Sequence, residues 1–106
     1  MAKFLIEASY TLDGSKGVLS GGGSARRTAL REMVESAGGK IEALYFAFGK
    51  HDIVIIVDMP DNVSAAAIAV QVKAAGSALI RTTVLMTPEE LDQAAKKGVK
   101  YRPPGK

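Results

Sequence analysis

The sequence contains no cysteine and only one histidine, and both scarcities exclude classes of site. Without cysteine the chain forms no disulfide, offers no thiolate nucleophile and holds no zinc ion or iron–sulfur cluster through sulfur ligands. The single histidine, His51, does not make a histidine-rich metal centre, and adding a carboxylate such as Asp52 gives only a weak ligand set. We therefore expect no bound metal and no resident cofactor.

Long apolar runs are missing as well. The longest, over residues 53–57, is far shorter than the ~20 residues that a membrane-spanning helix requires. Near the start of the chain, Glu7 follows a short apolar patch, whereas a signal peptide has a longer uninterrupted apolar centre. These absences favour a cytoplasmic protein with no membrane contact. The length of 106 residues fits a single domain.

Basic residues gather at one end of the chain. Residues 96–106 hold five bases and no acid, while the formal charge of the whole chain is +3. Without these five, nine bases stand against eleven acids, so the remainder is mildly acidic at −2. Because nucleic-acid-binding domains usually carry a basic stripe on the fold itself, we do not expect nucleic acid as a partner. We interpret residues 1–97 as the domain and residues 98–106 as a solvated basic tail, in preference to an RNA-binding or lipid-binding one.

Apolar periodicity predicts four strands. Residues 3–11 alternate between two kinds of side chain, as a half-buried strand does. Residues 40–48 and 53–59 are apolar stretches separated by turn-forming residues, which predicts a hairpin. The last strand is predicted over residues 78–86. In strand 40–48, one side is expected to hold Leu44, Phe46 and Phe48, and the other Ile41, Ala43 and Tyr45.

Two long helices and one short helix are expected between and after these strands. The Gly/Ser-rich stretch 13–24 is interpreted as a loop, with Ser24 capping the helix that follows. Gly38-Gly39 is predicted to end that helix, because glycine readily takes the left-handed exit. The second helix is expected from Asp61 to Gly76, and the third, which begins with a capping box, from Thr87 to about Lys97.

This β-α-β-β-α-β order predicts a ferredoxin-like α+β fold. Its four-stranded antiparallel sheet would carry both long helices on one face, with the short helix at the C-terminal end. The other face would have no helix to cover it, although strands 40–48 and 53–59 are apolar on both sides. We therefore expect a second copy of the chain to stack its sheet there, which makes the protein a homo-oligomer, a dimer or higher.

Three segments resemble the GYD-domain family of small bacterial proteins, and the resemblance covers nearly all of residues 3–95. The segments are SARRTALREMVESAGGKIEALYFAFGKHD, IVIIVDMPDN and AAGSALIRTTVLMTPEEL. The family is named for a Gly, Tyr, Asp cluster at the hairpin, which here reads Gly49-Lys50-His51-Asp52, so histidine replaces the usual tyrosine. The resemblance implies a dimeric α+β barrel, a group that includes cofactor-free monooxygenases, haem proteins, isomerases and ligand-binding modules. Membership of such a group does not select one function.

The hairpin residues are the first candidates for chemistry. His51 beside Asp52 could act as a general base, or His51 could be an ordinary polar turn residue. Gly49 is expected to serve the turn backbone, and Asp52 to cap or brace the turn. A serine–histidine–carboxylate set is not predicted, because one histidine and scattered serines occur in any chain.

Arg81 and Glu7 are the second candidates. The expected strand order makes the first and last strands neighbours, and both residues fall on the face without helices. A charged side chain is stable in a buried position only if it pairs with an opposite charge or binds a ligand. The two residues are therefore interpreted either as an ion pair that fixes the strand register or as part of a site for an anionic substrate.

The third candidates surround the Gly-rich stretch. Lys16 lies in it, and Arg26 and Arg27 follow it in the first turn of the expected helix, where free N–H groups favour an anion. Arginine there has the wrong sign for the helix dipole, which suggests another partner. The stretch lacks the Gly-Lys-Ser/Thr of a P-loop, and a flexible lid or spacer is the alternative. Tyr10 is a further pocket candidate, although aromatic residues in strands usually belong to the core.

These residues support three functions. The leading hypothesis is a homo-oligomeric module that binds a small molecule or anion between the open sheet face and the Gly-rich loop. The first alternative is a small enzyme of the dimeric α+β barrel type, either cofactor-free or haem-dependent, that uses His51 as base or ligand. The second alternative is a structural assembly protein that uses the sheet face to bind its partner.

Overall fold

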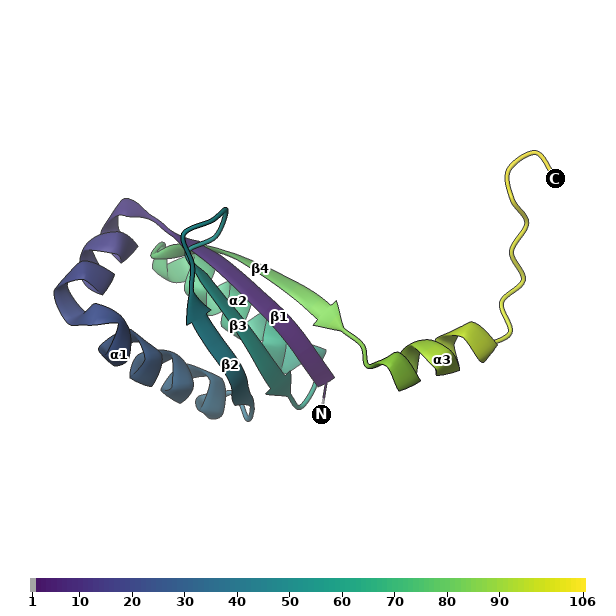
Figure 1. Cartoon of the computed structure of the whole chain (residues 1–106), viewed down its shortest axis with the longest axis horizontal. Coiled ribbons are helices and arrows are strands. Elements are labelled where there is room, and N and C mark those ends of the chain that lie inside the picture. The colour runs from purple at the N-terminus through teal and green to yellow at the C-terminus, as the bar shows by residue number, and fades with distance from the viewer. Residues whose placement is uncertain (1) are drawn as a thin grey trace.

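The computed structural model describes residues 2–106 and shows a ferredoxin-like α+β domain (Figure 1). The strands form one antiparallel sheet in the order β2-β3-β1-β4. The elements in chain order are β1 Ala2–Tyr10, α1 Leu12–Ser36, β2 Lys40–Phe46, β3 Ile53–Met59, α2 Asn62–Ala75, β4 Ala78–Leu85 and α3 Pro88–Lys96. The fold class predicted from the sequence is confirmed.

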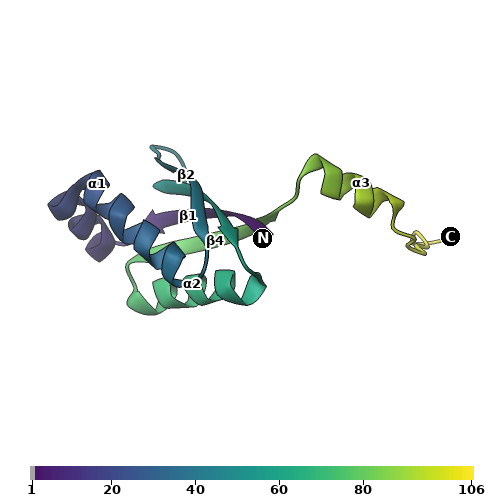
Figure 2. The same cartoon turned by 90° about the horizontal axis from the view of Figure 1, so that it is seen from below.

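The two central strands follow the predicted alternation. Phe4, Ile6 and Ala8 of β1 are buried, and so is every second residue of β3 from Ile53 to Met59. These side chains face the long helices. Figure 2 shows α2 and the C-terminal half of α1 on the same side of the sheet. Fully burying an aliphatic or aromatic side chain of this size contributes about 1.5–3 kcal/mol, so this layer supplies most of the stability of the domain.

The long helices lie over different halves of the sheet. α1 packs mainly on β2 and contributes Leu30 and Val34 to the core, whereas α2 packs mainly on β4 and contributes Ala65 and Ile68. The helices therefore straddle the central strands β1 and β3. This separation leaves space between the helices above the middle of the sheet.

The expected side-chain alternation in β2 is wrong because the strand contains a bulge. Ile41 pairs with Val57, but Ala43 pairs with the adjacent Ile56, so one extra residue is accommodated between them. A shift of one residue moves every following side chain to the other face. Ile41 and Leu44 therefore both pack against the core. The strand also ends at Phe46, earlier than expected, and Phe48 lies beyond it, fully exposed.

The expected loop at residues 13–24 is wrong as well, since α1 begins at Leu12. Thr11 caps the helix: its hydroxyl accepts from the Gly14 N–H at 3.2 Å and donates to the Gly76 carbonyl at 2.9 Å. The first turn thereby packs against the connection between α2 and β4. Tertiary contact outweighs the low helix propensity of glycine in this segment.

A kink divides α1 at Gly22, whose φ of 81° and ψ of 170° are not helical. A positive φ of this kind is readily adopted only by glycine. Ser24, which the sequence suggested as the N-cap, lies just after the kink, and its carbonyl accepts from the Thr28 hydroxyl. Because of the kink, residues from both halves of α1 line the space between the long helices and the sheet.

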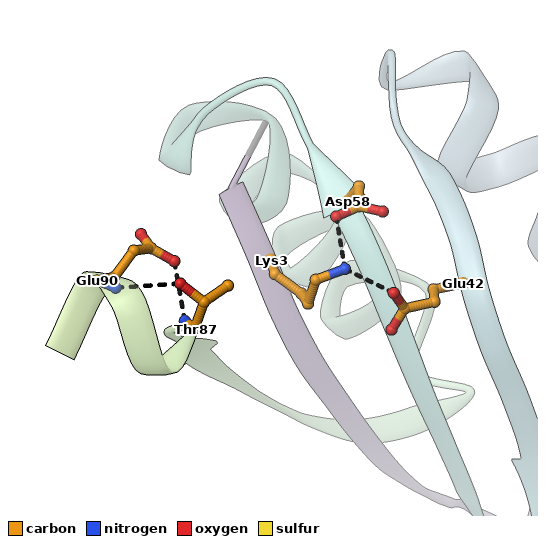
Figure 3. Close-up of polar contacts among 5 residues, drawn as sticks. All are labelled: Lys3, Glu42, Asp58, Thr87 and Glu90. Carbon is orange, nitrogen blue, oxygen red and sulfur yellow. Dashed lines mark hydrogen bonds and ion pairs between the residues drawn. The ribbon is translucent and has the colours of Figure 1, made fainter. Parts of the chain in front are cut away.

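The face of the sheet opposite the helices is called the open face below. Leu5, Val54 and Ile56 lie at its centre and are only partly buried. Near one end of it, the Lys3 ammonium donates to Glu42 at 2.8 Å and to Asp58 at 2.9 Å, which joins three strands (Figure 3). These two hydrogen bonds raise the pKa of Lys3 above its ordinary value.

α3 and the residues after it extend away from the sheet beyond the end of β4 (Figure 1). The helix starts with the predicted capping box, in which Thr87 and Glu90 exchange hydrogen bonds (Figure 3). No residue of α3 is buried. Across residues 2–106, no helix has both the length and the apolar character needed to cross a bilayer.

Candidate functional site

A cavity of about 220 Å³ lies between α1, α2 and the sheet. Its floor is formed by β1 and β3, through side chains such as Ile6, Ile53 and Ile55. Leu30 and Met33 of α1 form one wall, and α2 and β4 form the other. The cavity exists because the helices straddle the centre of the sheet, and its wall is largely apolar.

Four polar residues interrupt the apolar wall: Tyr10, Asp13, Arg26 and Ser77. Asp13 comes from the first turn of α1 and Arg26 from the helix just after the kink, so the bent helix brings the two together at one cavity. Burial raises the pKa of the Tyr10 phenol. The positive charge of Arg26 acts on that pKa in the opposite direction, and the negative charge of Asp52 adds to the rise.

The Arg26 side chain has an unusual environment. Its Nε atom is buried and has no hydrogen-bond partner. None of the ion pairs formed within residues 2–106 includes Arg26. Buried polar groups are nearly always hydrogen-bonded in folded proteins, so an exception of this kind requires an explanation.

Two of the residues that the sequence suggested as pocket candidates, Tyr10 and Arg26, line this cavity, whereas the sequence suggested a pocket on the other side of the sheet. The cavity lies on the helix side, not between the open face and a glycine-rich loop. The difference in position follows from the helical state of residues 12–21, because the first turn of α1 packs against Gly76 and Ser77 beside the helix-side cavity. Lys16 is exposed and is not part of the cavity wall. Histidine is also absent from the wall, so these residues do not fit a histidine-ligated haem.

Glu7 and Arg81 lie directly opposite each other on β1 and β4, as the sequence suggested. They do not form an ion pair in the described chain. Arg81 is exposed, so water solvates its charge and no protein partner is required. The nearest basic group to the Glu7 carboxylate is instead His51, whose Nε2 lies 3.6 Å from Glu7 Oε2.

The open face holds a chain of three functional groups that sequence reasoning did not predict. Ser9 Oγ lies 3.4 Å from His51 Nδ1, and Glu7 lies on the other side of the same ring. The order serine, histidine, carboxylate is that of a hydrolase triad, although both contacts exceed the ~2.6–3.2 Å of a working proton relay. The sequence contained only a weak indication of this group: Glu7 and Ser9 are two residues apart in a strand and therefore lie on the same face. Nothing local indicated that the hairpin would fold back beside them.

Asp52 braces the hairpin and does not support His51. Its carboxylate accepts from the Tyr10 N–H at 2.8 Å, and its own N–H donates to the Ala8 carbonyl at 2.9 Å. The structural role considered for Asp52 is thus observed, and its role as partner of a histidine base is not. Gly49 has no positive φ and open space around it, so its backbone geometry does not require glycine.

The carboxylates of the described chain do not converge on a metal site. Across residues 2–106, no group of three or more histidine, cysteine, aspartate or glutamate side chains lies close enough to hold a metal ion.

Comparison with known proteins gives one match. The family model described as GYD domain matches residues 4–95 of the chain. The search of curated proteins and the search of solved structures returned no significant match. The matched range includes every residue of the cavity wall and the Ser9–His51–Glu7 chain.

Proposed function

This chain belongs to the GYD-domain family, and we propose that it is a homo-oligomeric protein that binds a small, largely apolar molecule in the cavity between α1, α2 and the sheet. The observation that carries the proposal is the cavity itself. Protein interiors normally pack as densely as organic crystals, with few voids larger than a water molecule. A largely apolar space of about 220 Å³ with a few convergent polar groups is the usual form of a small-molecule site.

A filling substitution tests the cavity. Gly17 belongs to its wall, and a Cβ added there meets no atom within 4 Å, so leucine at this position has room to occupy the space. Aminoanthracene, a neutral apolar fluorophore, is the probe. We expect Gly17→Leu to weaken its binding at least tenfold. Gly21→Leu, on the same helix and outside the cavity wall, is the matched control and should bind the probe as the unaltered protein does.

Each of the three possible fluorophore results has a different meaning. Loss of binding in Gly17→Leu alone supports the cavity as the site. Equal binding in all three proteins would place the fluorophore on another surface and remove the proposal. If the fluorophore binds none of them while the protein is oligomeric, the assembly function becomes the better account.

Support for the homo-oligomer comes from the open face. Leu5, Val54 and Ile56 form its apolar centre, and no element of the described chain covers them. A second sheet stacked on this face would bury them. Sedimentation velocity on Ile56→Lys tests this: we expect a dimer or larger species for the unaltered protein and a monomer for the variant. Val63→Lys, on an exposed position of α2, is the control and should leave the assembly intact.

One observation favours a second candidate, a small enzyme that uses the Ser9–His51–Glu7 chain on the open face. In such an enzyme Glu7, not Asp52, would support His51 as the base. A fluorophosphonate probe tests it, because Ser9 Oγ would attack phosphorus and displace fluoride while His51 accepts the proton. Labelling that disappears in both Ser9→Ala and His51→Gln supports this function. An unlabelled protein, or labelling that survives in His51→Gln, would eliminate it.

A further inference from the structure

Arg26 indicates which chemical class the cavity accepts. The guanidinium group is charged at every physiological pH and offers five N–H donors and no acceptor. Its Nε–H is buried without an acceptor, while the apolar floor of the cavity lies beside it. A buried, charged donor of this kind is stabilised only when an acceptor, preferably an anionic one, reaches it.

The protein itself does not supply that acceptor. Tyr10 and Asp13 share the cavity with Arg26, but neither forms a hydrogen bond or ion pair with it. Asp13 is exposed in the first turn of α1, where its charge interacts favourably with the helix N-terminus and is solvated. The remaining wall is mostly aliphatic. Only a ligand or a solvent molecule can therefore satisfy the Arg26 Nε–H.

We propose that the ligand of the cavity is a small apolar carboxylic acid whose carboxylate is bound by Arg26 and whose hydrocarbon body fills the space above β1 and β3. This inference rests on the proposed small-molecule function and adds the class of ligand. A carboxylate pairs with arginine through two parallel hydrogen bonds, and the side-on arrangement uses Nε–H together with one terminal N–H.

The cavity volume limits the size of the acid. An apolar protein cavity of about 150 Å³ accepts benzene, so a space of about 220 Å³ accommodates one ring with a short acid chain. Phenylpropanoate has this form. The aliphatic residues Ile6, Ile55 and Leu30 would contact its ring, and its carboxylate would lie beside the α1 kink.

Isothermal titration calorimetry with a matched pair of ligands tests whether the cavity prefers a carboxylic acid. Phenylpropanoate and phenylpropanol share the ring and chain and differ in the charged group. We expect the acid to bind the unaltered protein at least tenfold more tightly than the alcohol. In Arg26→Met the two should bind equally, because methionine keeps the apolar stem and removes the donors. Arg27→Met, a change of the exposed neighbouring arginine, should keep the full preference for the acid.

A second variant keeps the test valid if Arg26→Met fails to fold. Asp13 is the only acidic residue of the cavity wall, and it is exposed, so Asp13→Asn leaves the core intact. Removing its negative charge should tighten phenylpropanoate binding several-fold and leave phenylpropanol binding unchanged. An equal effect on both ligands, or no effect on either, would show that the acid does not bind in this cavity.

The outcomes separate the two proposals. Equal affinity of acid and alcohol for the unaltered protein, or loss of the acid preference in Arg27→Met, would overturn the carboxylate class. If aminoanthracene still binds in a manner sensitive to Gly17→Leu, the proposed function survives that result. If neither ligand nor the fluorophore binds, both proposals fail together.

Discussion

Gly14 and Gly17 stand one turn apart on α1 and have different surroundings. A Cβ at Gly14 would overlap the carbonyl oxygen of Ser77, whereas a Cβ at Gly17 would meet open space. Both have helical backbone angles, so alanine is conformationally allowed at either position. The close approach at Gly14 is therefore a packing requirement, whereas at Gly17, which lines the cavity, packing does not exclude a side chain.

Matched alanine substitutions should separate these two roles. We expect Gly17→Ala to raise the free energy of unfolding by about 0.5–1 kcal/mol, because alanine loses less backbone entropy in a helix. Gly14→Ala should lower the free energy of unfolding by about 1–3 kcal/mol, because the methyl group displaces the first turn of α1 from Ser77. Urea denaturation measures both. Equal effects of the two changes would contradict the observed packing of the helix start.

The pKa of the Tyr10 phenol depends on the charge of Arg26, which gives a second prediction at the scale of single residues. Burial raises the pKa of its phenol, and Arg26 opposes that rise. We expect Arg26→Met to raise the pKa further and Arg27→Met to leave it unchanged. The measurement is an alkaline absorbance titration of tyrosinate. The exposed Tyr45 and Tyr101 serve as internal references. A fall in the Tyr10 pKa in Arg26→Met would show that Arg26 is not beside the phenol.

At the scale of single elements, two local irregularities determine the shape of the site. The bulge in β2 directs both Ile41 and Leu44 to the core, and the kink at Gly22 bends α1 around the end of the sheet. Without the kink, a straight helix could not place both Asp13 and Arg26 on one cavity. The N-caps of α2 and α3 are regular by comparison, and each follows from a local sequence signal, whereas the start of α1 at Thr11 does not.

The α2 cap gives a prediction about acid stability. The Asp61 carboxylate accepts from the Ser64 N–H at 2.8 Å, and this bond lowers the pKa of Asp61 below its ordinary value. A lowered pKa in the folded state stabilises the fold above the unfolded value of ~3.9, and the contribution is lost as the pH falls through the folded pKa. Asp61→Asn keeps an acceptor but does not titrate.

We therefore expect the stability difference between the unaltered protein and Asp61→Asn to be present at neutral pH and to shrink on acidification. Chemical denaturation over a series of pH values measures it. A difference that stays constant or grows in acid would mean that the Asp61 carboxylate is not hydrogen-bonded to Ser64 in solution.

At the scale of the whole molecule, α3 is the helix of the described chain that has no buried residue. It belongs to an arm that extends from the sheet and helices, and with this arm the described chain is 57 Å long in its longest direction. Leu91 is 61% exposed, and Ala94 and Ala95 lie on the same side of the helix. Isolated helices shorter than about 12–15 residues are only marginally stable in water, and α3 has 9 residues. The basic end of the chain and the mildly acidic remainder are complementary in charge, so in the proposed homo-oligomer we expect the arm to contact another copy.

Substitution of Leu91 tests that contact. We expect Leu91→Glu to shift the assembly toward smaller species in sedimentation velocity, because the variant places a charge on the apolar side of the arm. Gln93→Glu adds the same charge at a neighbouring exposed position and should leave the assembly unchanged. An identical response of the two variants would mean that the arm takes no part in assembly.

The order of the elements, the buried faces of β1 and β3, the caps at Asp61 and Thr87, and the placement of Glu7 and Arg81 on one face of neighbouring strands could all be predicted from the sequence. These features depend on side-chain periodicity or on signals within a few residues, which a single sequence contains. The tertiary structure alone decided that residues 12–21 are helical, that β2 carries a bulge, and that Tyr10 and Arg26 share a cavity on the helix side. Each of these results depends on contacts between segments that are distant in the sequence: the first turn of α1 with Ser77, β2 with β3, and both long helices with the sheet around the cavity.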